Sequence, residues 1–131
     1  MLHFVVAAAL VDADGRVLVQ QRPDHKPMPG LWEFPGGKVE PDELPEAALL
    51  RELHEELGIE TDRACLAPAS FASEPLGDRH LLLLLYVLRK WRGTPAALHA
   101  TALRWARPPE LFALDMPPAD RPLIGLLDAL I

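Results

Sequence analysis

The chain has 131 residues, of which half are apolar and 24% are charged, and this is the composition of one ordinary globular domain. Nineteen acidic residues against thirteen basic ones give a net charge of −6, which argues against a protein that binds polymeric nucleic acid through a basic surface. The single cysteine, Cys65, cannot close a disulfide within the chain, so we expect a reducing, cytoplasmic compartment. No apolar run approaches the ~20 residues of a membrane helix, and nothing in the sequence indicates an oligomeric state.

The first third of the chain predicts strands and a loop. Residues 3–11 and 16–22 are mostly apolar, and Gly15 between them suits a left-handed turn position, which predicts a β-hairpin. Residues 22–30 are rich in proline, so this segment is predicted to be a loop and not a helix. Residues 31–34 are expected to form a short extended piece.

A helix is predicted from about Glu43 to Leu57, ending at Gly58, a typical C-terminal glycine. Its apolar stripe consists of Leu49, Leu50, Leu53 and Leu57. Glu52, Glu55 and Glu56 lie at spacings of three and four, so they are expected to share the opposite face. Three like charges on one face repel each other. They form either a solvated acidic face or a site for a hard cation such as Mg²⁺ or Mn²⁺.

The second half predicts three more strands and two more helices. The strands are expected at residues 64–71, 81–91 and 102–106, and the run 81–88 is so apolar that we expect it to be buried on both faces. Residues 108–114 and 120–131 are predicted to be helical. This alternation predicts an α/β (α+β) layered domain.

The residues around the acidic helix follow a motif with fixed spacing. From Gly37 the chain reads Gly, five residues, Glu43, seven residues, then Arg-Glu-Leu-His-Glu-Glu-Leu-Gly-Ile over residues 51–59. This pattern resembles the Nudix box, the signature of the Nudix hydrolases, at every position. The resemblance implies a single Nudix hydrolase domain over residues 1–131. It also implies the Nudix fold, a mixed central β-sheet sandwiched between helices.

The motif residues have distinct expected roles. Gly36 and Gly37 let the backbone turn tightly and approach a ligand. Glu43 and Arg51 are about two helical turns apart, so they can pair and fix the loop against the helix, a structural role in the family. Lys38 is either a phosphate contact or a solvated loop lysine.

The catalytic and metal-binding roles are implied by the resemblance. It makes Mg²⁺, or Mn²⁺ in its place, the expected cofactor, and Glu52 the expected general base. The implied ligands are Glu52, Glu55, Glu56 and the backbone carbonyl of Gly37.

The segments outside the box resemble the MutT-type enzymes, which cleave nucleoside triphosphates, often oxidised ones such as 8-oxo-dGTP, to the monophosphate and pyrophosphate. The resemblance covers residues 30–40, 103–105, 111–114 and 117–122. It implies that Arg22 and Arg79 contact the substrate; the alternative for each is a solvated strand end.

Two positions depart from the MutT-type pattern. His99 stands where many members have a glutamate that helps to hold metal or water; it either compensates or has no role, because imidazole is a poor Mg²⁺ ligand. Asp120 stands where an asparagine commonly reads the base. An ionised carboxylate only accepts hydrogen bonds, which suits the amino group of cytosine, whereas a protonated one can also donate one to 8-oxoguanine. The alternative role for Asp120 is to cap the last helix.

The sequence therefore predicts an Mg²⁺-dependent nucleoside triphosphate diphosphatase that removes 8-oxo-dGTP from the nucleotide pool. The first alternative is a pyrophosphohydrolase of CTP or 5-substituted dCTP. The second is a Nudix-fold binding or regulatory module with weak or no catalysis.

Overall fold

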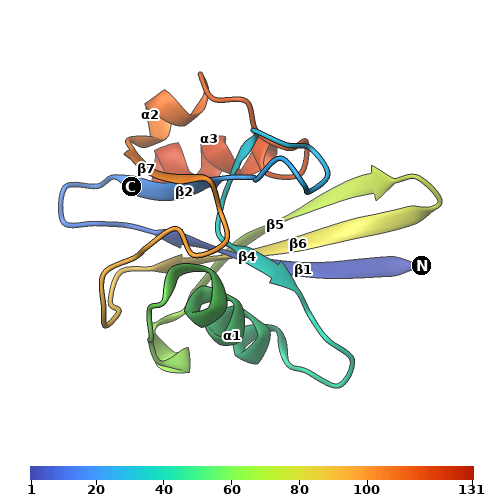
Figure 1. Ribbon diagram of the computed structural model, residues 1–131, viewed down its shortest axis with the longest axis horizontal. Helices are drawn as coiled ribbons and strands as arrows, with labels where there is room; N and C mark the ends of the chain where they lie inside the picture. Colours follow the sequence, from blue (N-terminus) through green and yellow to red (C-terminus); the bar gives the residue numbers. More distant parts are fainter.

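The computed structural model describes residues 1–131 and shows two β-sheets between helices: α1 covers one side of the sheet layer, and α2 and α3 cover the other (Figure 1). The helices are α1 (Pro45–Leu57), α2 (Pro108–Leu111) and α3 (Arg121–Leu130). The strands are β1 (Leu2–Leu10), β2 (Val17–Gln21), β3 (Trp32–Glu33), β4 (Gly36–Lys38), β5 (Ala67–Leu76), β6 (Arg79–Leu88) and β7 (Ala102–Ala106). The predicted α+β class is confirmed. No helix is both long enough and apolar enough to cross a membrane.

The expected central sheet is divided in two. One sheet has the order β4-β1-β6-β5, in which β1 and β6 run parallel, and the other is antiparallel with the order β3-β2-β7. The predicted hairpin of the first two strands is therefore wrong, since β1 and β2 share only the bridge between Val11 and Val17. Gly15 does adopt the left-handed conformation, with φ of 79°. The turn joins the strands at its base only, and longer pairings with β6 and β7 then draw them into different sheets.

Several predicted boundaries need correction. The long helix begins at Pro45, two residues later than expected, because proline suits the first helical turn, and it ends as predicted before Gly58, whose φ is 73°. The strand expected at 64–71 is wrong at both ends: residues Arg63–Cys65 form a 3₁₀ turn, and β5 continues to Leu76. The helix expected at 108–114 stops at Leu111, whereas β7 matches its prediction.

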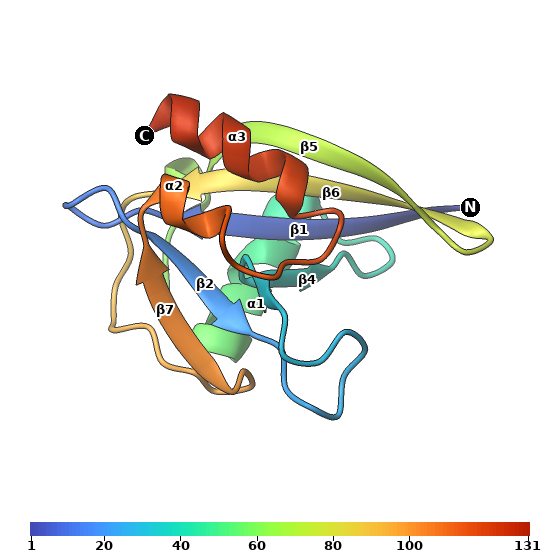
Figure 2. The same cartoon turned by 90° about the horizontal axis from the view of Figure 1, so that it is seen from above.

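Residues 81–88, in strand β6, are expected to be buried on both faces, but only the second half of this run is fully buried. Tyr86, Val87 and Leu88 are buried, but Leu82 and Leu84 are half-buried. Figure 2 shows the reason: the tip of the β5–β6 hairpin extends beyond both α1 and α3. An apolar run therefore indicates a strand here without fixing how much of it the helices cover.

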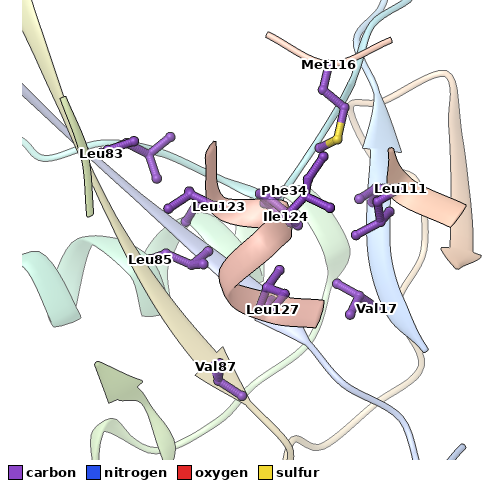
Figure 3. Close-up of a cluster of buried hydrophobic side chains, with 14 of the residues drawn as sticks. Val17, Phe34, Leu83, Leu85, Val87, Leu111, Met116, Leu123, Ile124 and Leu127 are labelled. Carbon is purple, nitrogen blue, oxygen red and sulfur yellow. The ribbon is translucent and has the colours of Figure 1, made fainter. Parts of the chain in front are cut away.

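Two hydrophobic clusters lie on opposite faces of the four-stranded sheet. Leu49, Leu53 and Leu57 of α1 pack against one face. On the other face, Leu123, Ile124 and Leu127 of α3 lie between β6 and Val17 of β2 (Figure 3). Because successive strand residues point to opposite faces, residues 6, 8 and 10 of β1 enter the first cluster, and residues 7 and 9, together with Val11 directly after β1, enter the second. The sheet thus holds α1 and the segment before α3 on either side of one cleft.

Candidate active site

A cavity of about 430 Å³ opens between β1, β4, α1, the loop after β2 and the segment that leads into α3. Most of the residues that the sequence singled out line it: Arg22, Gly36, Gly37, Lys38, Glu52, Glu56, His99 and Asp120. Glu55 and Arg79 are not among its lining residues. The cavity has an acidic end, where α1 meets β4, and a second end beside Asp120.

Glu52 lies directly against the backbone of Gly37 at the acidic end. A Cβ atom on Gly37 would lie 2.6 Å from either carboxylate oxygen of Glu52, which is closer than such atoms can approach. Gly36 leaves as little room, because a Cβ atom there would overlap the carbonyl oxygen of Val6 on β1. The paired glycines thus let β4 fit between β1 and the Glu52 carboxylate.

Glu56 is buried beside Glu52, with 8% of its surface exposed. Burial raises the pKa of Glu56 to about 8, and the nearby charges of Glu52 and Glu33 add to this effect, while a hydrogen bond from Gln20 opposes it. The expectation that Glu56 faces away from the apolar stripe is wrong. It follows Leu49 by seven residues, about two turns, and so lies on the same side of the helix.

Glu55 is the one box glutamate that faces solvent. Its side chain is 48% exposed and lies 3.4 Å from the guanidinium of Arg51. No three carboxylate, imidazole or thiol groups in the structure converge closely enough to form a metal-binding group. The structure therefore brings Glu52, Glu56 and Gly37 together and leaves Glu55 at the rim.

Arg51 and Glu43 form the predicted pair. Nε and Nη2 of Arg51 each donate a hydrogen bond of 2.9 Å to one oxygen of Glu43, and Nη1 donates to Glu52 at 2.9 Å. Nη2 also donates to the carbonyl oxygen of Lys38 at 3.2 Å. The bond from Arg51 is the main reason that the pKa of Glu43 falls to about 2. Arg51 thus fastens the loop to α1 and orients the Glu52 carboxylate.

Asp120 closes the second end of the cavity. It occupies the position before α3, but its side chain makes no capping hydrogen bond, so the capping alternative is wrong. Instead, its Oδ2 accepts the backbone N–H of Phe34 at 3.1 Å. Asp120 is 5% exposed, and burial raises its pKa to about 7; Glu33 adds to this effect, and the Phe34 bond and Arg22 oppose it. A carboxyl group that changes charge near neutral pH therefore faces the cleft.

Arg22 lines the cleft as expected and is already paired. Its Nη1 donates to Glu33 at 2.6 Å, and its Nε donates to the carbonyl oxygen of Pro27 at 2.7 Å. Sequence reasoning missed Glu33, because no motif spacing marks it. The pairing of β2 with β3, which sets Gln21 opposite Trp32, is what brings Glu33 beside Arg22.

The other predicted residues lie around the rim. Lys38 is exposed at the end of β4, and Arg79 is exposed at the start of β6. Burial lowers the pKa of His3, which also lines the cavity, and the positive charges of Lys38 and Arg79 lower it further. His99 is exposed on a loop fastened to the site by two backbone bonds, from Leu98 to the Glu56 carbonyl at 3.1 Å and from Thr101 to the Gln21 carbonyl at 3.0 Å.

Known proteins resemble this chain over nearly its whole length. The model of the NUDIX domain matches residues 1–127. The CTP pyrophosphohydrolase of Escherichia coli strain K12 is 43% identical over 125 residues, which are 95% of this chain and 91% of that protein. The 8-oxo-dGTP diphosphatase of the same strain is 32% identical over 131 residues, 99% of this chain and 100% of that one. The solution structure of the E. coli ORF135 protein matches with a TM-score of 0.87 and 39% identity, covering 98% of this chain and 90% of that one.

Proposed function

The chain belongs to the Nudix family, and from that premise we propose that it hydrolyses nucleoside triphosphates to the monophosphate and pyrophosphate. One observation supports this activity above all. Glu52 lies against the backbone of Gly37, with Glu56 beside Glu52, at one end of a cleft whose other end presents a buried carboxyl group, Asp120. Such a cleft has a place for the phosphates and a place for the base.

The acidic end fits a divalent cation. Burial, and the charge of Glu52 beside it, raise the pKa of Glu56, so a bound cation would supply the opposite charge that this buried corner favours. Mg²⁺, or Mn²⁺ in its place, would be held by Glu52, Glu56 and the carbonyl of Gly37, with Glu55 as the ligand nearest to solvent. When bound, the cation neutralises the diphosphate and polarises the attacking water.

Each of the other side chains around the cleft has its own proposed role. Glu52 takes the proton of the attacking water, and Arg51 keeps the Glu52 carboxylate in position through its 2.9 Å bond. Arg22 contacts the substrate inside the cleft. Lys38 and Arg79 attract the phosphates from the rim. Attack at the β-phosphorus yields the monophosphate and pyrophosphate, and the cytoplasm, where the nucleotide pool lies, is the matching compartment.

We propose 8-oxo-dGTP as the first candidate substrate, with removal of oxidised nucleotides as the role. Protonated Asp120 can donate a hydrogen bond to O6 of 8-oxoguanine, and its pKa of about 7 makes that form available at neutral pH. A cytosine nucleotide is the second candidate, because ionised Asp120 suits the cytosine amino group and because a relative of 43% identity is named CTP pyrophosphohydrolase.

A pyrophosphate-release assay with Mg²⁺ tests both candidates. The panel contains 8-oxo-dGTP, dGTP, CTP, dCTP and a 5-substituted dCTP, with Glu52→Gln as the matched inactive control. A large advantage in kcat/KM for 8-oxo-dGTP supports the first candidate, and an advantage for cytosine nucleotides supports the second. If no nucleotide is cleaved, the chain is a binding or regulatory module instead. If the wild type cleaves a nucleotide and Glu52→Gln cleaves it equally well, the acidic end is not the catalytic site.

A further inference from the structure

Gln20 is a polar side chain of the cleft that the chemistry above does not use. It lies on β2, is 5% exposed, and lines the cavity beside Glu56. Its Nε2 donates a hydrogen bond of 2.5 Å to Oε1 of Glu56. Its Oε1 is the one buried side-chain oxygen or nitrogen atom in the structure that has no hydrogen-bond partner.

Folding alone does not favour an amide at this position. Leu18, two residues earlier on the same face of β2, is fully buried in the cluster under α1. A leucine at position 20 would extend that apolar row. A buried acceptor without a donor instead destabilises the fold, and such atoms are rare in proteins. The orphaned Oε1 therefore indicates a hydrogen-bond donor that binds in the cleft.

The backbone around Gln20 and Glu56 is held firmly. β2 is the central strand of its sheet, and Gln20 is paired with Glu33 on one side and Leu103 on the other. The carbonyl of Glu56 accepts the N–H of Leu98 at 3.1 Å, so the residue is fixed both at its main chain and at its carboxylate. A side chain on such a strand can set the direction of the carboxylate that it binds.

We infer that Gln20 is a positioning residue: its amide group holds the Glu56 carboxylate toward the cleft, and its free carbonyl oxygen accepts a hydrogen bond from a water molecule bound there. This role rests on the proposed function, in which Glu56 binds the divalent cation. The neutral amide suits the task. A lysine or arginine would neutralise Glu56 and compete with the cation, and a carboxylate would repel it.

The test compares three variants in the intact protein. Gln20→Leu removes both polar groups, Gln20→Glu keeps an acceptor but loses the donor, and Gln21→Leu removes the neighbouring amide, which donates to the Gly30 carbonyl at 3.2 Å and does not touch Glu56. Mn²⁺ binding is measured by calorimetry without nucleotide. The kcat and KM values are then measured for the nucleotide that the wild type cleaves, and thermal unfolding is recorded for each variant.

We expect both Gln20 variants to bind Mn²⁺ about 10- to 100-fold more weakly and to lose kcat by a similar factor, with little change in KM. Gln21→Leu should retain the Mn²⁺ affinity of the wild type, even if its melting temperature falls. Wild-type Mn²⁺ affinity and kcat in folded Gln20→Leu or Gln20→Glu would overturn the inference, as would an equal loss of affinity in Gln21→Leu. A wild type that binds Mn²⁺ but cleaves no nucleotide would overturn the proposed activity instead, and the binding data would still decide the role of Gln20.

Discussion

The two ends of the cleft are built in opposite ways. At the acidic end, Gly37, Arg51, Glu52 and Glu56 come from one stretch of twenty residues, and an arginine and an amide hold the carboxylates in place. At the other end, Asp120 binds the backbone of Phe34, 86 residues earlier, and its charge is disfavoured by burial. Apart from the amide of Gln20 on β2, the acidic end depends on local spacing, whereas the other end depends on how distant segments meet.

The largest expected effects lie at the acidic end. Glu52→Gln removes the proposed base and should lower kcat by at least about 100-fold, the size of a general-base contribution.

Gly37→Ala retains every carboxylate but places a methyl group where Glu52 lies. Displacement of this catalytic group should lower kcat by about 100-fold as well. Steady-state kinetics check both. Near wild-type kcat in Gly37→Ala would contradict the close packing of this end.

The next largest effect is expected on the stability of the folded protein when Asp120 is replaced, and it depends on pH. Its pKa is raised from 3.8 to about 7, so its contribution to stability is fully present below about pH 4 and is lost as the pH rises through 7. Asp120→Asn does not titrate, so it should gain stability relative to the wild type by about 1–4 kcal/mol between about pH 4 and pH 8. Chemical denaturation across this range measures the difference. A pH-independent difference would show that the pKa of Asp120 is the same in the folded and the unfolded protein.

For Glu43 we expect a smaller effect on stability, with the opposite dependence on pH. Its pKa is lowered from 4.5 to about 2 by Arg51, so the stability that it contributes is present above about pH 4.5 and is lost as the pH falls toward 2. Glu43→Gln should therefore melt at a lower temperature than the wild type at neutral pH, and the gap should close in acid. Melting curves at several pH values test this. A gap that stays constant would mean that the Arg51 pair does not stabilise the loop.

The smallest effects are expected at the rim. Lys38→Ala and Arg79→Ala each remove an exposed charge, so we expect KM to rise by no more than about fivefold, corresponding to roughly 1 kcal/mol. Added salt should shrink that rise, because it screens exposed charges. Arg22→Ala serves as the comparison, since Arg22 is partly buried in the cleft and its loss should raise KM further at every salt concentration. A salt-independent rise for Arg79→Ala would mean direct contact with the bound nucleotide.

The difference between the two ends of the cleft also explains which features could be predicted from the sequence. Short-range spacing was enough to predict the helix end at Gly58 and the pairing of Arg51 with Glu43, which lies just before α1, because both depend on residues close in the sequence. Glu33 and Gln20 escaped notice, since each gains its role from a partner brought near by strand pairing or helix packing. The wrong hairpin of β1 and β2 has the same origin: the turn was visible, but the competing strands β6 and β7 follow it by sixty residues or more.

The three consecutive alanines of β1 have a consequence for how the protein can vary. Ala7, Ala8 and Ala9 are at most 2% exposed and point alternately to the two hydrophobic clusters. Their methyl groups therefore set the spacing of the layers on both sides of the sheet at once. A valine at any of them adds volume to a close-packed interior, which typically destabilises by about 1–3 kcal/mol. The chemistry of the cleft can then diversify through its loops, while this strand restricts the thickness of the framework that carries them.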